Sequence, residues 1–259
     1  MKTTDPIGLF DSGIGGTSIW REVHALLPNE NTIYLADSKN APYGAKSIDE
    51  IINLSFKNTE FLLNENCKLI VVACNTATTN AIKELRSKYN VPFIGIEPAI
   101  KPAALQSKTH SIGILATKGT LSSKLFHKSV ENHPDVKIIE QIGHGLVQLI
   151  ENGAINTTEM RELLESYLIP MVNKNIDYLV LGCSHYPYLI PLIKKIIPAN
   201  IKIIDSGEAV AKQTRKVLLQ HKLINESVTN SSQLFYTNSD PKVLEQILNY
   251  KEKVTFKNF

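Results

Sequence analysis

Two stretches of this chain join a short apolar run to a cysteine and then to small polar residues. In the first, Leu69 to Ala73 is apolar and rich in β-branched residues, and Cys74 is followed at once by amide and hydroxyl side chains. Such a run is typical of a buried strand, and the polar residues favour the start of a helix. The stretch Leu179 to His185 repeats the pattern around Cys183. We therefore predict two cysteines at carboxyl ends of parallel strands, where α/β proteins bind ligands.

Strand and helix patterns alternate along the chain, and the series then begins again. Leu9 and Ile114 lie at equivalent points of the two series, 114 − 9 = 105 positions apart, and the two cysteines are 183 − 74 = 109 apart. We interpret this as a structural duplication. The expected strands are Ile7 to Phe10, Thr32 to Ala36, Leu69 to Ala73, Pro92 to Ile96, Ser111 to Ala116, Val136 to Ile142, Tyr178 to Gly182 and Ile201 to Ile204. The expected helices are Thr17 to Leu27, Ser47 to Leu63, Leu121 to Val130 and Thr158 to Val172.

The tail adds further elements that we expect to pack on the first series. It reads as a helix from Glu208 to about Leu219, a strand at Gln233 to Thr237 and a helix from Pro241 to Tyr250. The predicted domains are therefore 1–97 plus 208–259, which is discontinuous, and 98–207. The fold class is α/β, with two similar domains of mainly parallel sheets flanked by helices and an active site in the cleft between them.

Composition narrows the class of protein. With 43% hydrophobic and 20% charged residues the chain is globular, and its net charge of +3 comes from scattered lysines, so no nucleic-acid groove is implied. We find no signal peptide and no apolar run of about 18 residues, so we expect a cytoplasmic protein without a membrane partner. The three cysteines are expected to remain thiols in a reducing compartment, with Cys67 structural.

Two opposed thiols suit the inversion of a carbon stereocentre. One face of the carbon must lose a proton and the other must gain one, so a thiolate on one side and a thiol on the other can do both. A free cysteine is only a few per cent thiolate near neutrality, so polar neighbours must assist. Asp11 in the glycine-rich turn and His185 beside Cys183 are the candidates. Taken singly, each residue also has a structural reading as a cap, a buried thiol or a hydrogen-bonded histidine.

Four motifs together resemble the cofactor-independent glutamate racemases. They are DSGIGG at 11–16, APYG at 41–44, ACNTATT at 73–79 and LGCSHYPYL at 181–189, and the resemblance extends from Ile7 to about Tyr250. It implies two α/β domains that enclose L- or D-glutamate, a pair of catalytic cysteines, no cofactor, no metal, a homodimer, and D-glutamate for peptidoglycan. One departure is Ser184, where the family usually has threonine.

The resemblance also implies roles for individual residues. The catalytic residues would be Cys74 and Cys183, with Asp11 and His185 assisting proton transfer. The substrate-binding residues would be Asp11, Ser12, Pro42, Tyr43, Gly44, Asn75, Thr76, Thr120, Glu151, Ser184 and His185.

Two other functions remain open from the sequence. In a zinc or cysteine hydrolase, Cys183, His185 and Cys74 would hold a metal or form a nucleophile with its base, although Cys-x-His is tight for two ligands on one ion. In a two-lobed amino-acid binding protein, the same lobes would hold a ligand without chemistry. Aspartate racemases share the paired-cysteine plan, so the length of the acidic substrate is a further open point.

Overall fold

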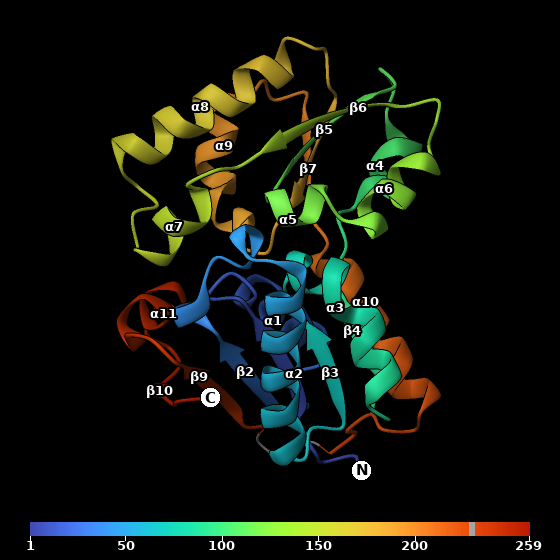
Figure 1. Ribbon diagram of the computed structural model, residues 1–259, viewed down its shortest axis with the longest axis vertical. Coiled ribbons are helices and arrows are strands. Elements are labelled where there is room, and N and C mark those ends of the chain that lie inside the picture. Colours follow the sequence, from blue (N-terminus) through green and yellow to red (C-terminus); the bar gives the residue numbers. More distant parts are fainter. Residues whose placement is uncertain (228–230) are drawn as a thin grey trace.

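The computed structural model describes residues 1–227 and 231–259, and it contains two all-parallel sheets. The larger sheet has the strand order β10-β9-β2-β1-β3-β4. Figure 1 shows it in one lobe of the molecule, which also holds both chain termini. Its strands are β1 (Ile7–Asp11), β2 (Thr32–Ala36), β3 (Leu69–Val72), β4 (Phe93–Gly95), β9 (Gln233–Thr237) and β10 (Val254–Phe256).

The smaller sheet forms the second lobe and has the order β6-β5-β7-β8. Its strands are β5 (Ser111–Ala116), β6 (Lys137–Ile142), β7 (Tyr178–Gly182) and β8 (Lys202–Ile204). Within each lobe the first four strands of the series are arranged second, first, third, fourth. The two series inferred from the sequence therefore share one topology, and the predicted α/β class is confirmed.

Helices cover both faces of the larger sheet because its strands alternate apolar side chains between the faces. Ile7 and Leu9 of β1 point into the core under α1 (Thr17–Leu26) and α10 (Gly207–Gln220). Phe10 points into the opposite core, under α2 (Ile48–Asn64) and α3 (Asn75–Lys88). The central strands are thus packed between two helical layers, and the loops that follow their carboxyl ends lie at the edge of this core.

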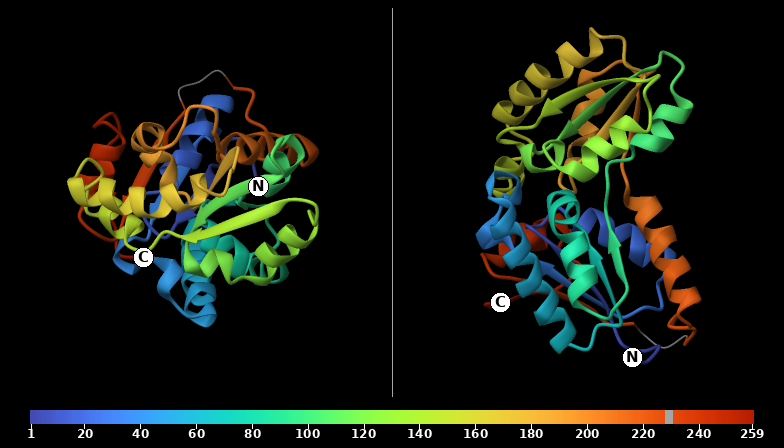
Figure 2. Two further views of the ribbon diagram at one scale, coloured as in Figure 1. Left: turned by 90° about the horizontal axis from the view of Figure 1, so that it is seen from above. Right: turned by 45° about the vertical axis from the view of Figure 1, so that its right-hand side comes forward.

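The smaller sheet is covered in the same way (Figure 2). On one face, Ile112 and Ile114 pack with α4 (Ile100–Gln106), α5 (Lys118–Leu121) and α6 (Lys124–Glu131). On the other, Leu179 and Leu181 pack with α7 (Leu146–Glu151), α8 (Thr158–Val172) and α9 (Ile190–Ile196).

The chain crosses between the lobes at two neighbouring points. One lies between β4 and α4 and the other between β8 and α10, and the Ser206 hydroxyl ties them by donating to the Glu97 carbonyl. After α10 the tail adds β9 beside β2, with register from Thr32–Gln233 to Ala36–Thr237. The tail then forms α11 (Pro241–Ile247) and the outer strand β10.

Some predicted elements end elsewhere than expected. The helix predicted over Leu121 to Val130 is replaced by α5 and α6, because Thr117 and Ser123 each cap a separate helix start. The helix predicted to reach Tyr250 stops at Ile247, since Asn249 and Tyr250 adopt left-handed conformations with φ of 57° and 55°. Among the described residues, none of the helices combines the length and apolarity that crossing a membrane requires.

Candidate active site

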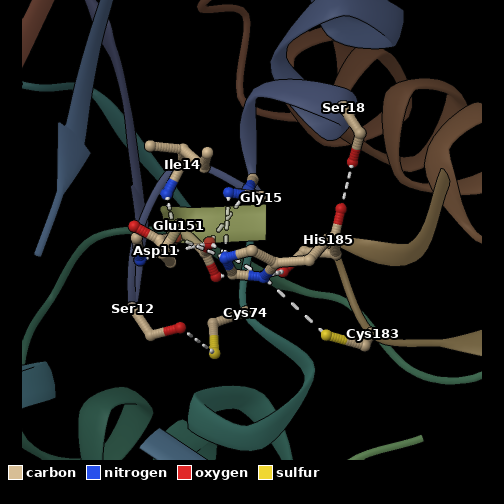
Figure 3. A network of polar contacts seen from close by, with 12 residues as sticks. Asp11, Ser12, Ile14, Gly15, Ser18, Cys74, Glu151, Cys183 and His185 are labelled. Atoms are coloured by element: carbon tan, nitrogen blue, oxygen red, sulfur yellow. Dashed lines mark hydrogen bonds and ion pairs between the residues drawn. The ribbon is translucent and has the colours of Figure 1, made fainter. Parts of the chain in front are cut away.

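The carboxyl ends of four strands meet at a pocket between the lobes. β1 and β3 lead into it from the larger sheet, and β5 and β7 from the smaller one. Cys74 and Cys183 both line this pocket, so the two sequence motifs that carry them come together. Figure 3 shows both cysteines within one network of polar contacts. The remaining lining residues are Ser12, Pro42, Tyr43, Gly44, Asn75, Thr76, Thr117, Val147, Ser184 and His185.

Cys74 occupies the N-cap of α3, as the sequence pattern predicts. Its sulfur accepts a hydrogen bond from the Ala77 amide at 3.4 Å, and its thiol donates to the Ser12 hydroxyl at 3.7 Å. Burial raises the pKa of the Cys74 thiol well above its ordinary value, and the charge of Asp11 raises it further. The contacts with Ala77 and Ser12 act in the opposite direction. Burial and the charge of Asp11 thus both favour the protonated form of the Cys74 thiol.

Cys183 is held differently. No α-helix begins directly after it. The chain instead turns through Ser184 and His185 into a short 3-10 helix, Tyr186–Leu189. Its nearest polar partner is the Nδ1 atom of His185, 3.8 Å from the sulfur. A helix start therefore lies beside Cys74, whereas at Cys183 an imidazole takes that place.

His185 lies between Cys183 and a carboxylate. Its Nε2 atom is 2.5 Å from Oε1 of Glu151 and 3.3 Å from the Gly15 amide nitrogen. The Gly15 amide can donate only to an unprotonated Nε2, whereas the Glu151 contact needs a proton between Nε2 and Oε1. Because the Glu151 contact is much the shorter, we assign that proton to Nε2, which then does not accept from Gly15. Burial alone would lower the pKa of His185, but the hydrogen bonds to Cys183 and Glu151 and the charge of Asp11 outweigh it and raise the pKa well above its usual value. The ring is thus set to carry a proton to or from Cys183.

Asp11 lies at the end of β1 and is fully buried. Its Oδ2 atom accepts hydrogen bonds from the Gly16 amide at 2.9 Å and the Gly13 amide at 3.3 Å, and its Oδ1 atom accepts one from the Ser184 hydroxyl at 3.1 Å. Burial raises the pKa of Asp11, partly offset by the charge of His185. The carboxyl group therefore connects the turn after β1 to the turn after β7, on the pocket's inner side.

Two glycines of the turn after β1 are required for space. A Cβ atom on Gly13 would lie 1.9 Å from Oε1 of Glu151, and one on Gly15 would lie 2.2 Å from Nδ1 of His185. The turn thus leaves room for the two side chains that reach it from the other lobe. The space that these side chains need explains the two glycines of the motif.

Asn75 presents an unsatisfied group to the pocket. Its side chain is 2% exposed, and neither its amide nitrogen nor its amide oxygen has a hydrogen-bond partner within the described part of the chain. Buried amides are normally hydrogen-bonded, so this group is available to a ligand. Beside it, the Thr76, Thr117 and Thr120 hydroxyls form a triangle with sides of 2.8, 3.0 and 3.4 Å.

The loop with Pro42, Tyr43 and Gly44 forms another wall of the pocket. The Tyr43 hydroxyl donates to the buried carboxylate of Asp37, which also accepts a hydrogen bond from Asn238 Nδ2 at 2.5 Å. Asn238 Oδ1 in turn accepts from the Lys39 amide at 3.0 Å. The tail of the chain therefore holds this loop in place.

The predicted site residues fall into two groups. Ten of them line the pocket itself, whereas Asp11, Thr120 and Glu151 lie behind it and reach it through Ser184, Thr76 and His185. Thr117 and Val147 line the pocket but were not predicted. Thr117 had a signal in the sequence, because it lies 117 − 12 = 105 positions after Ser12, the same offset that relates Leu9 to Ile114.

The geometry also bears on a metal site. Within residues 1–227 and 231–259, no group of three or more His, Cys, Asp or Glu side chains is arranged to hold a metal ion. The residues that a zinc enzyme would use here, Cys183 and His185, contact each other, and the second imidazole nitrogen contacts Glu151.

Comparisons with known proteins agree with this architecture. The family described as Asp/Glu/hydantoin racemase matches residues 15–214. A glutamate racemase from Herpetosiphon aurantiacus is 43% identical over 237 residues, which are 91% of this chain and 93% of that protein. A solved glutamate racemase isoform from Bacillus anthracis has a TM-score of 0.89 and 30% identity, covering 99% of this chain and 98% of its own. A glutamate racemase from Francisella tularensis, solved in complex with D-glutamate, has a TM-score of 0.85 and 29% identity, with the same coverage.

Proposed function

This chain belongs to the Asp/Glu/hydantoin racemase family and is an amino-acid racemase, and from that premise we propose that it interconverts L-glutamate and D-glutamate without a cofactor. The observation that carries the proposal is that Cys74 and Cys183, which end strands in different lobes, line one pocket. Two thiols from two separate sheets can address opposite faces of one α-carbon.

The proposed reaction is a proton exchange at the α-carbon. One cysteine thiolate takes the α-proton, the electron pair of the C–H bond remains on the substrate, and the opposite thiol gives its proton to the other face. The two sulfur atoms then exchange roles for the reverse direction. At the Cys183 side we assign proton exchange to His185, and at the Cys74 side to Asp11 with the Ser12 hydroxyl as neighbour.

The substrate's negative charge would be held by neutral donors and backbone amides. We propose that the α-carboxylate contacts the start of α3 near Asn75 and Thr76, where a helix end attracts anions and where the unsatisfied Asn75 amide lies. The stabilised transition state carries more negative charge than the substrate, so donors placed there contribute to the rate as well as to binding. The wider set of proposed substrate-binding residues is Asp11, Ser12, Pro42, Tyr43, Gly44, Asn75, Thr76, Thr120, Glu151, Ser184 and His185.

Glutamate is proposed over aspartate because the relatives that match most of this chain are named glutamate racemases and one solved neighbour holds D-glutamate. The same relationship supports three further proposals: that the D-glutamate supplies peptidoglycan synthesis, that the enzyme acts in the cytoplasm, and that two copies form a homodimer. We also propose that its domains are residues 1–97 plus 208–259 and residues 98–207, since β9 and β10 belong to the larger sheet.

The proposal is tested by incubating each enantiomer of glutamate, and separately of aspartate, in deuterated water. A racemase places deuterium at the α-carbon while optical rotation decays to zero, and we expect this with glutamate well before aspartate. Glutamate that binds but keeps its α-proton and its rotation would show a binding protein instead. Faster exchange with aspartate would reassign the substrate.

A further inference from the structure

Glu151 occupies a position that its own helix does not favour. It is the last residue of α7, where backbone carbonyls point toward the helix end and repel a carboxylate. Its side chain is 12% exposed, so water screens this repulsion only in part. Contacts from outside α7 must therefore hold it.

Three donors converge on this carboxylate. Oε1 accepts hydrogen bonds from the Ile14 amide at 2.7 Å and from His185 Nε2 at 2.5 Å, and Oε2 accepts one from the Ser38 hydroxyl at 2.8 Å. Ile14 and Ser38 belong to the larger-sheet lobe, whereas Glu151 belongs to the smaller-sheet lobe (Figure 3 shows the Ile14 contact). Both oxygen atoms of the Glu151 carboxylate are thus held by hydrogen bonds. The orientation of the carboxylate toward His185 depends on the contacts that Ile14 and Ser38 make with these two atoms.

The Ser38 backbone is itself firmly placed. The preceding residue, Asp37, receives a hydrogen bond from Asn238, and the amide of the following residue, Lys39, donates to the same asparagine. Ser38 lies outside the cysteine pocket, in an adjoining hollow that it shares with Glu151 and Pro42. A substitution at Ser38 can therefore affect proton transfer through Glu151, and it does not remove a group that lines the cysteine pocket.

Resting on the function proposed above, we propose that Ser38 is a positioning residue for one half of the reaction: its hydroxyl orients Glu151 so that His185 exchanges protons with Cys183. Cys74 has other polar neighbours, Ser12, Ala77 and Asp11, and the Ser38 hydroxyl donates to Glu151 instead. Loss of the Ser38 hydroxyl should therefore slow proton transfer at Cys183 and leave transfer at Cys74 unchanged.

Rates alone cannot show this asymmetry. The two enantiomers have equal free energies in water, so kcat/KM must be the same in both directions for every variant. The primary deuterium isotope effects on kcat/KM, in contrast, need not be equal in the two directions. When Cys183 removes the α-proton, a slower step at Cys183 enlarges the deuterium isotope effect on kcat/KM. In the other direction Cys183 only returns a proton, so the isotope effect of removal at Cys74 becomes smaller.

The experiment compares wild type and Ser38→Ala with α-deuterated L- and D-glutamate. We expect kcat/KM to fall about tenfold in Ser38→Ala, as for loss of a hydrogen bond to a charged group. The two isotope effects should move apart, one rising and the other falling relative to wild type. Ser38→Thr keeps the hydroxyl and should restore both the rate and the isotope effects.

Ser18→Ala provides the matched control. Its hydroxyl also bridges the lobes, donating to the Ser184 carbonyl at 2.8 Å, but it contacts neither Glu151 nor the His185 ring. Its two isotope effects should stay at wild-type values. The proposal is overturned if the isotope effects of Ser38→Ala stay at wild-type values or move together, or if those of Ser18→Ala diverge equally. A wild-type protein that fails to exchange the α-proton would instead refute the proposed function itself.

Discussion

Substituting Gly15 by alanine tests whether the position of the His185 ring controls the reaction. A Cβ atom at Gly15 would lie 2.2 Å from Nδ1, 2.4 Å from Cγ and 2.7 Å from Cε1 of the ring. Ordinary van der Waals contact begins at about 3.4 Å, so the ring must retreat by 3.4 − 2.2, or about 1.2 Å. It is 1% exposed, and Glu151 and Cys183 occupy the space around it, so this retreat breaks its contacts.

The expected loss follows from that displacement. Misplacing a catalytic group by about 1 Å costs on the order of 100-fold in rate, or about 2.7 kcal/mol of transition-state stabilisation. Overpacking costs about 1–3 kcal/mol of folding stability, and each kcal/mol lowers the Tm of a chain of this size by about 3 °C. Racemisation followed by circular dichroism at 25 °C and thermal unfolding of the same sample separate the two effects.

Gly113→Ala is the matched control for this substitution. Gly113 lies in β5, and its added Cβ would meet the side-chain ends of Met171 at 2.6 Å and Ile176 at 2.8 Å, inside the smaller-sheet core. It should lower Tm while kcat stays within about twofold of wild type. If Gly15→Ala keeps more than half of the wild-type rate, or if Gly113→Ala loses as much activity, the position of the ring does not control the rate.

Three further outcomes are expected. Cys74→Ser and Cys183→Ser should each lose at least about 100-fold in racemisation, the lower end for a general acid or base, with Tm little changed; a full-rate variant would contradict the assignment. Burial raises the pKa of Asp11, so ionising this carboxyl group costs free energy in the folded state but not in the unfolded state. Wild type should therefore lose stability as pH rises above 3.8, whereas Asp11→Asn, which cannot ionise, should not. The Tm of Asp11→Asn minus that of wild type should grow accordingly. Unfolding scans at pH 4 and pH 8 measure it, and a constant difference would count against a raised pKa. Asn238→Ala should raise KM more than it lowers kcat, because the substitution removes the contact with Asp37 that helps to hold the loop carrying Tyr43. Initial rates at varied glutamate concentration measure both constants. A loss of kcat with unchanged KM would contradict this expectation.

Local sequence was sufficient for most of the fold. β7 coincides with the predicted strand Tyr178 to Gly182, and α8 with the predicted helix Thr158 to Val172, because each combines a clear apolar period with capping or turn residues. The short strand β10 and the helices α4, α7 and α9 were not predicted. Their segments are only three to seven residues long, too short for a period to be distinguished.

Most residues of the site could be predicted from the sequence, but the contacts between these residues and the rest of the chain could not. Cys74 could be placed from its own neighbours, since a strand leads into it and helix-capping residues follow it. The contact of Glu151 with the Ile14 amide joins positions 137 residues apart, and that of Asn238 with Asp37 joins positions 201 apart. Such contacts depend on how the lobes meet and on the return of the tail, neither of which leaves a periodic pattern in the sequence.

The return of the tail gives the order of synthesis a role in assembly. All four strands of the smaller sheet leave the ribosome before β9, which is made from residues 233–237, so the lobe begun second is the first whose sheet can be completed. Until β9 arrives, β2 has an open edge of the kind that recruits other chains. A chain truncated before residue 233 would therefore contain both cysteines, but β2 would have an unpaired edge. It would also lack Asn238, which bonds to Asp37 and Lys39 beside the loop of residues 42–44. The segment from β9 to Asn238 must therefore be synthesised before the larger sheet and the loop after β2 can be completed.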